Sequence, residues 1–145
     1  MGNEVIQHEA NIATNIAKWL RTQYPKVIYR YDIADMKLTI PQRNRMKALQ
    51  GETRGYPDLF LAEPKNGFHG LYVELKKDYA SVFKKDGSYK KDDHIQEQAE
   101  FHKVLRDKGY QVVWGLGFED TKDKIKEYMS PIGKEKINEK QGSLL

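Results

Sequence analysis

A chain of 145 residues has the size of one domain, which predicts a single core and no second globular unit. It contains no cysteine, so disulfides, thiolate metal sites and a cysteine nucleophile are excluded. The formal net charge of +4 is mildly positive and is compatible with a polyanionic partner. No run approaches the roughly 18 apolar residues of a membrane helix, and no signal peptide is recognisable, so a cytoplasmic protein is expected.

The first elements expected are a helix and a strand. Apolar side chains recur at helical spacing over residues 4–22, and Pro25 follows because the residue before a proline avoids the helical conformation. Residues 27–31 (VIYRY) are β-branched or aromatic and predict a strand.

A short basic helix is expected next, beginning at Pro41 and closed by Gly51. Arginine binds phosphate in a bidentate manner, and Arg43, Arg45 and Arg54 all precede the chemical motif described below. These arginines are candidate DNA contacts, although the same sequence pattern is expected of a basic surface that serves only solubility.

Two strands joined by a tight turn form the centre of the chain. Residues 58–61 (DLFL) and 70–76 (GLYVELK) have strand composition, and the Asn-Gly pair within 64–67 favours the positive φ angles of a hairpin turn. The two strands are therefore expected to pair as an antiparallel hairpin.

A lysine-rich loop over residues 77–93 follows, with a turn at Gly87-Ser88 that suggests a mobile hairpin flap. Charge runs are usually solvated faces, but lysines interleaved with aromatic residues also suit a nucleic-acid groove. The candidate DNA-binding lysines are Lys77, Lys84, Lys85, Lys90 and Lys91, and the aromatic residues among them are Tyr79, Phe83 and Tyr89.

The remaining elements are a helix over 94–108, a strand over 110–114 and a helix over 119–129. The resulting order, α-β-(α)-β-β-α-β-α, predicts an α/β domain in which helices flank a mixed β-sheet. The domain is expected to span residues 1–130, followed by a polar and flexible tail over 131–145.

Three charged side chains form the candidate active site. Glu74 and Lys76 share one face of their strand, and Asp58 begins the neighbouring strand, from which it can reach Glu74. Two carboxylates can hold Mg²⁺, to which the Leu75 carbonyl could add a ligand, and the lysine can stabilise charge on a phosphate. These residues therefore suit phosphodiester hydrolysis. A Glu-x-Lys tripeptide on an exposed strand is common by chance, and the preceding Pro-Asp pair is what favours catalysis.

The spacing of Pro57-Asp58 and Glu74-Leu75-Lys76 resembles the PD-(D/E)XK nuclease superfamily. The wider string GYPDLFL…GLYVELKK…QAEFHKVLRDKGYQVVWG resembles its VRR-NUC (virus-type replication-repair nuclease) branch, from about residue 5 to 118. This resemblance implies a restriction-endonuclease-like α/β core and Mg²⁺- or Mn²⁺-dependent hydrolysis of DNA. The loop between Lys76 and Gln98 is longer than the family pattern, so its role does not follow from the resemblance.

The resemblance also implies two supporting residues. The glutamine that begins the family's helix corresponds to Gln98, with Gln96 as the competing register, and its amide would orient a water or contact phosphate. The glutamate of the N-terminal helix corresponds to Glu9, which would contact the metal or a water. Each of the two could instead be an ordinary exposed helix residue. The four histidines show no metal-binding spacing and are given no role.

Stand-alone members of this branch act as homodimers on branched DNA, including four-way junctions. The resemblance thus implies a structure-selective endonuclease of phage or bacterial replication and repair, in a bacterial or phage-infected host cell. Two alternatives stay open: a restriction-type endonuclease that reads sequence, and a DNA-binding module without catalysis.

Overall fold

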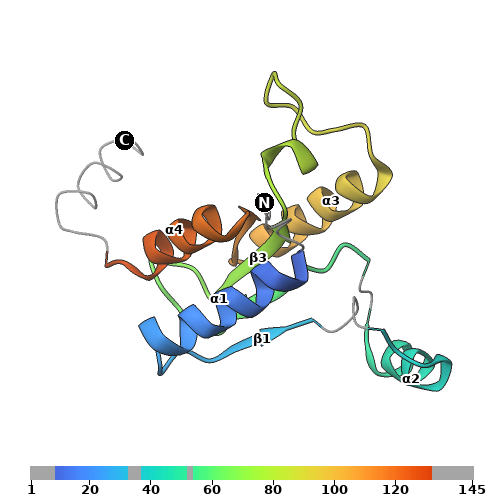
Figure 1. Cartoon of the computed structure of the whole chain (residues 1–145), viewed down its shortest axis with the longest axis horizontal. Coiled ribbons are helices and arrows are strands. Elements are labelled where there is room, and N and C mark those ends of the chain that lie inside the picture. Colours follow the sequence, from blue (N-terminus) through green and yellow to red (C-terminus); the bar gives the residue numbers. More distant parts are fainter. Residues whose placement is uncertain (1–8, 33–36, 52–53, 132–145) are drawn as a thin grey trace, which may run out of the picture.

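Helices and strands alternate along the chain in the predicted order (Figure 1). The computed structural model describes residues 9–32, 37–51 and 54–131. The start of the helix expected over 4–22, and nearly all of the tail expected over 131–145, lie outside those residues. The elements are α1 (Glu9–Gln23), β1 (Tyr29–Tyr31), α2 (Ile40–Leu49), β2 (Leu59–Leu61), β3 (Leu71–Lys76), the short 3₁₀ helix η1 (Tyr79–Ser81), α3 (Asp93–Asp107), β4 (Gln111–Leu116) and α4 (Phe118–Met129).

The four strands form one mixed sheet in the order β1-β2-β3-β4, as the sequence predicts. β2 pairs antiparallel with both β1 and β3, whereas β3 and β4 are parallel and are connected through α3. β4 continues to Leu116, beyond the predicted end at residue 114, because it stays paired with β3 as far as Lys76.

The β2–β3 hairpin closes through the predicted turn. Asn66 and Gly67 both have positive φ, 54° and 86°, which is the conformation that a two-residue hairpin turn of this kind requires. A bridge between Lys65 and Phe68 flanks them. Beyond this bridge the ladder pairs Leu61 with Leu71 and Leu59 with Val73.

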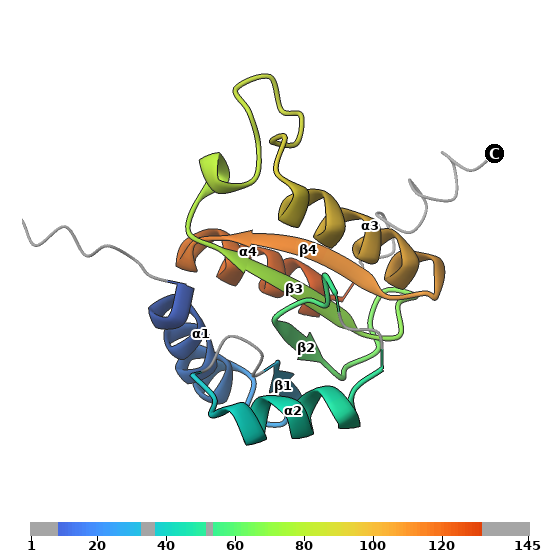
Figure 2. The same cartoon turned by 90° about the vertical axis from the view of Figure 1, so that its right-hand side faces the viewer.

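Helices cover both faces of the sheet (Figure 2). On one face, Leu71, Val73 and Leu75 of β3 join a core with apolar residues of α1 and α4. On the other face, Tyr72 packs with Leu105 of α3. All six residues of β3 are consequently buried, so the strand carries its charged residues in the interior rather than on an exposed face.

Helix α2 differs from its prediction at both ends. Thr39 caps it through a capping box with Gln42, so the helix begins before Pro41 rather than at it. It ends at Gln50 in an extended conformation, and Gly51 does not adopt the positive φ expected of a closing glycine. None of its residues is buried, and it stands apart from the sheet (Figure 1).

Strand β4 forms one edge of the sheet, and side chains bond its backbone. The bonds are Arg106 Nη2 to the Val112 carbonyl (2.9 Å), Lys124 Nζ to the Trp114 carbonyl (2.6 Å) and the Leu116 N–H to Asp120 Oδ2 (2.9 Å). Across the described residues, no helix has both the length and the apolar character that crossing a membrane requires.

Candidate active site

Asp58 and Glu74 meet at one end of the β2–β3 hairpin. Leu59 pairs with Val73, so Asp58, one residue before β2, comes opposite Glu74, one residue further along β3. Asp58 Oδ2 accepts a hydrogen bond of 2.8 Å from the Leu75 N–H. The two carboxylates are therefore neighbours, as the sequence predicts.

The Leu75 carbonyl of β3 also points to the side of the strand where Asp58 lies. The Lys76 carbonyl accepts from Gly117 N at 2.8 Å, on the β4 side. Its neighbour Leu75 must face the opposite side, where its N–H meets Asp58. Because the N–H and C=O of one strand residue point the same way, the Leu75 carbonyl is directed to the Asp58 side.

Glu74 is covered by helix α3 and is only 1% exposed. Its Oε1 lies 3.2 Å from Nε2 of His102, a fully buried residue of α3. The His102 ring packs against the ring of Trp114 at a centroid distance of 4.6 Å. A histidine that the sequence analysis discounted thus contacts the central carboxylate.

The charge state of His102 follows from its surroundings. Burial lowers the pKa of His102 to about 4; the positive charges of Arg106 and Lys76 act in the same direction and Asp58 opposes them. The imidazole is neutral at pH 7, so its contact with Glu74 is a hydrogen bond rather than an ion pair.

Gln98 lies on the same face of α3, one helical turn before His102. It is 5% exposed, and its Oε1 has no hydrogen-bond partner in the described part of the chain. The competing residue, Gln96, is exposed and donates to the Lys90 carbonyl at 3.1 Å. Of the two glutamines, Gln98 is therefore the one that faces the sheet.

Helix α1 approaches Asp58 through Tyr31. The Tyr31 hydroxyl donates to the Ala13 carbonyl at 3.0 Å. The pKa of Tyr31 is raised, chiefly by burial and then by Tyr29 and Asp58. Glu9 begins α1 one turn before Ala13, so the start of the helix lies on the Asp58 side. The side chain of Glu9 is outside the described part, and its predicted role stays a prediction.

A glycine turn sets Asp58 against α3. Gly55 has a φ of +80°, and a Cβ built on it would lie 2.8 Å from the Glu97 carbonyl oxygen and 3.1 Å from the Gln98 Cα. The turn before Pro57-Asp58 thus rests on the helix that carries Gln98.

We expect Gly55→Ala to destabilise the protein by about 2–4 kcal/mol, since it adds an overlap with α3 to the strain of positive φ. Urea unfolding measures the loss. Gly67→Ala is the matched control, because Gly67 also has positive φ (+86°) but no atom lies within 4 Å of the added Cβ. Equal losses in the two variants would contradict the close contact with α3.

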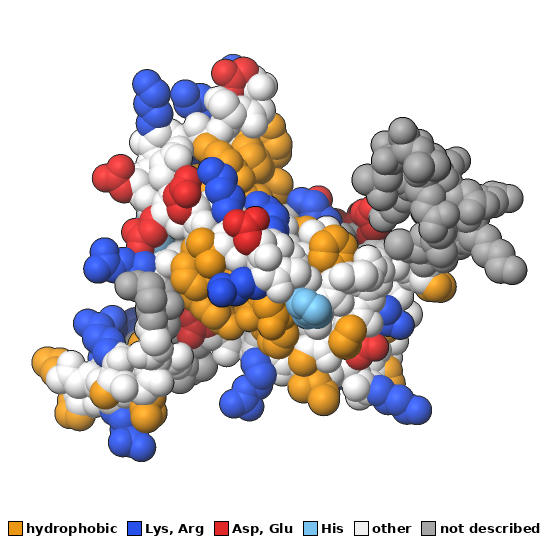
Figure 3. All heavy atoms as spheres, turned by 180° about the vertical axis from the view of Figure 1, so that it is seen from behind, with side chains coloured by type: hydrophobic (Ala, Val, Ile, Leu, Met, Phe, Trp, Pro, Cys, Tyr) orange, Lys and Arg blue, Asp and Glu red, His pale blue; other side chains and the backbone are white. Residues whose placement is uncertain are grey.

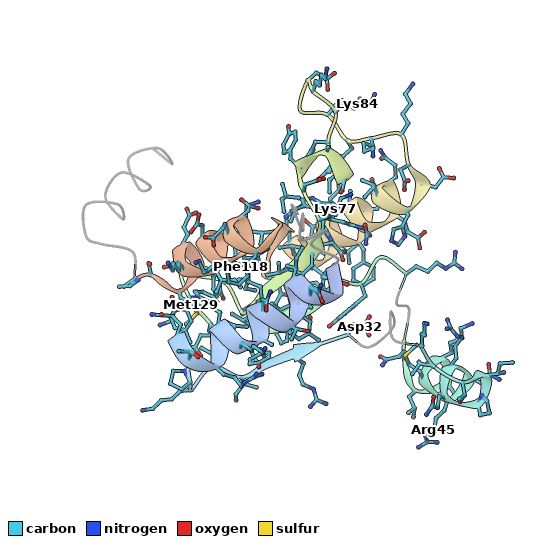
Figure 4. All side chains as sticks on the ribbon, in the orientation of Figure 1. Asp32, Arg45, Lys77, Lys84, Phe118 and Met129 are labelled. Carbon is cyan, nitrogen blue, oxygen red and sulfur yellow. The ribbon has the colours of Figure 1, made fainter. Side chains whose placement is uncertain are left out.

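The candidate DNA-binding residues occupy two separate elements. Lys84, Lys85, Lys90 and Lys91 are exposed on a hairpin that follows β3, Lys77 is exposed at its base, and Arg43, Arg45 and Arg54 are exposed on or just after α2. Figure 4 shows Lys84 near the top of the molecule and Arg45 near its bottom, and in Figure 3 acidic and hydrophobic side chains lie among the basic ones on the surface between them. The basic residues therefore form two regions rather than one patch.

The lysine-rich segment forms the predicted hairpin, through a bridge between Phe83 and Tyr89. These two rings stack on each other at 5.2 Å and also contact Trp114. Two of its three aromatic residues thus anchor the hairpin to the domain, and Tyr79 is the aromatic residue left largely exposed, at 49%.

The donor set suits a hard cation. Within residues 9–32, 37–51 and 54–131, no three His, Cys, Asp or Glu side chains converge on one point. The oxygens available here are the Asp58 and Glu74 carboxylates and the Leu75 carbonyl on the Asp58 side of β3, and Gln98 Oε1 is buried on α3 without a hydrogen-bond partner among the described residues. Oxygen ligands completed by water are what Mg²⁺ prefers, so the residues present fit a magnesium or manganese ion.

No protein-family model and no curated protein matches this chain. Among solved structures it is similar to one described as a "VRR_NUC domain protein", with a TM-score of 0.59 and 23% identity, covering 83% of this chain and 87% of the other. The chain has the VRR-NUC fold. The resemblance seen in the sequence and the α/β class that it implies are confirmed at the level of the fold.

The functional candidate that sequence reasoning missed is His102. Its one signal is its place four residues after Gln98, which puts both side chains on one face of the helix. That spacing indicates a contact with Glu74 only when it is known that the face of α3 that carries Gln98 packs over Glu74.

Proposed function

We propose that this protein is a Mg²⁺- or Mn²⁺-dependent deoxyribonuclease. The observation that carries the proposal is the placement of Asp58 opposite Glu74, with buried Lys76 on the same strand and buried Gln98 on the helix that covers Glu74, in a chain whose fold is similar to that of a VRR_NUC domain protein. These are acceptors for a hard cation beside a single ammonium group, a combination suited to hydrolysing a phosphodiester.

In this proposal Asp58, Glu74 and the Leu75 carbonyl hold the metal ion, with Glu9 as a further ligand. A bound ion supplies Lewis-acid polarisation of the phosphate and lowers the pKa of a water. The role of Lys76, only 9% exposed beside Glu74, is to hold the attacking water and to stabilise negative charge on the phosphate. Gln98 accepts a hydrogen bond from that water.

DNA would lie against the end of the sheet where Lys76 leads into the lysine-rich hairpin. The exposed lysines of the hairpin and the arginines at α2 then contact phosphates on either side of the site. Their separation between the top and the bottom of the molecule suits a substrate that is extended or branched rather than a short single strand (Figure 4).

The finer proposal is a structure-selective endonuclease that cuts branched DNA such as four-way junctions as a homodimer. Its support is the resemblance noted above, together with symmetry: one chain carries one candidate site, and two copies are needed to cut two strands. The setting would be phage or bacterial replication and repair, in the cytoplasm of a bacterial or phage-infected cell.

The test compares cleavage of labelled four-way junction, flap and linear duplex DNA in Mg²⁺, Mn²⁺ or EDTA. Wild type is expected to cut with either metal and not in EDTA, whereas Lys76→Ala loses about 10²–10³-fold in rate. Lys103→Ala is the control, because Lys103 is exposed on α3 and pairs with Glu100.

Each other outcome of that comparison points elsewhere. Preference for linear duplex of defined sequence would favour the restriction-type enzyme. Tight binding without metal-dependent cutting of any substrate would contradict the nuclease and favour the DNA-binding module.

A further inference from the structure

We propose that His102 is a positioning residue, which holds the Glu74 carboxylate in the orientation that binds the metal ion. This inference rests on the proposed function of the site. It assigns a role to a histidine that neither the sequence pattern nor the structural comparison singles out.

The first argument is the geometry of the pair. His102 Nε2 and Glu74 Oε1 are 3.2 Å apart, and the two side chains are 0% and 1% exposed. A carboxylate that binds a cation only accepts hydrogen bonds, so the imidazole must donate from Nε2 in this contact. A hydrogen-bond donor held against Oε1 restricts rotation of the Glu74 carboxylate group. A carboxylate held in one orientation binds a metal ion better than one that rotates freely.

The second argument is that the imidazole is itself held firmly. Its ring lies 4.6 Å from the Trp114 ring, and Trp114 in turn donates from Nε1 to the Tyr89 hydroxyl at 3.2 Å. Trp114 of β4 therefore packs against the histidine, and Tyr89 of the lysine-rich hairpin holds the tryptophan in place. A donor seated in this way can orient an acceptor, whereas a free side chain cannot.

The third argument comes from what His102 leaves unsatisfied. Nδ1 is buried and has no hydrogen-bond partner among the described residues. An unpaired buried polar atom costs about 1–3 kcal/mol, so an apolar side chain would serve packing better here. Packing alone therefore does not explain a histidine at this position, whereas the hydrogen bond to Glu74 does.

Groups that hydrogen-bond metal ligands from behind typically contribute about 10–100-fold in metal affinity or activity. We therefore expect His102→Leu to weaken Mn²⁺ binding, measured by electron paramagnetic resonance without DNA, about 10–100-fold, with a similar loss in cleavage rate. His102→Gln should recover most of both, because its amide nitrogen can occupy the place of Nε2 and donate to Glu74.

Thermal unfolding in EDTA separates positioning from folding. The two variants are compared at a temperature where both are folded, and the Gln variant should bind Mn²⁺ more tightly than the Leu variant whatever their order of stability. Wild-type Mn²⁺ affinity in His102→Leu would overturn the inference. The inference would also be overturned if both variants lost the same Mn²⁺ affinity and that loss followed the fall in their melting temperatures.

A second readout needs no substitution. The nitrogen chemical shifts of the His102 ring, measured by NMR on the wild-type protein, should report a proton on Nε2, the nitrogen that faces Glu74. The opposite tautomer would remove the donor and overturn the inference. A wild type that cuts DNA normally while His102→Leu is unaffected refutes this inference alone, whereas a wild type that neither binds Mn²⁺ nor cuts refutes the proposed function and this inference with it.

Discussion

Replacing Glu74 with glutamine is expected to reduce metal-dependent cleavage by about 10²–10³-fold or more while leaving the fold intact. Glutamine keeps the size of the side chain but loses the negative charge that a divalent ion requires. Because Glu74 is 1% exposed, no water can replace the lost ligand without rearrangement. Mn²⁺ binding should weaken in parallel with cleavage.

Although cleavage falls, the free energy of unfolding of Glu74→Gln should rise or stay unchanged. A buried charge is costly, and the neutral amide oxygen can still accept the hydrogen bond from His102. Urea unfolding in EDTA should therefore show a free energy of unfolding no lower than that of wild type. Glu100, which is exposed on α3, provides the control as Glu100→Gln. Full activity in the Glu74 variant would exclude this residue as a metal ligand.

Replacing Gly115 with alanine is expected to destabilise the protein by about 2–4 kcal/mol. Gly115 lies in β4 opposite Leu75, where α4 packs closely. An added Cβ would overlap the Thr121 hydroxyl and lie 2.9 Å from Val73 Cγ1. Thr121 is fully buried and donates to the Gly117 carbonyl at 2.7 Å, so it cannot move aside without losing that bond.

Two further variants make this prediction specific. Gly51→Ala should change the free energy of unfolding by less than about 0.5 kcal/mol, because no atom lies within 4 Å of the added Cβ. Thr121→Ala should restore part of the stability of Gly115→Ala, since it removes the overlapping hydroxyl. Additive losses in the double variant would contradict a direct contact between the two positions.

The sequence predicted those features that depend on local pattern. Alternation along β3 placed Glu74 and Lys76 on one face, and the Asn-Gly turn fixed the hairpin that brings Asp58 opposite Glu74. Residues 27–31 were predicted as one strand, but β1 begins only at Tyr29, because Val27 N is bonded to the Tyr24 carbonyl in the turn after α1.

The features that were missed depend on contacts between elements distant in sequence. The burial of Glu74 and its contact with His102 both arise because α3 packs over β3. Aromatic residues of the hairpin were interpreted as a surface for nucleic acid, yet Phe83 and Tyr89 pack toward Trp114, which lies on a later strand. Lysine spacing alone cannot show which way the rings between the lysines point.

The bonded edge of β4 limits how copies of this protein can associate. An unprotected edge strand can recruit a strand of another chain, through open-ended stacking or a continuous intermolecular sheet. Here such recruitment would have to displace Arg106, Lys124 and Asp120 from the strand's backbone, breaking three hydrogen bonds before any new one forms. A dimer of this protein, if it forms as proposed, should therefore bury side-chain surface rather than join its sheets at β4, and the same three side chains should protect the protein from aggregation at high concentration.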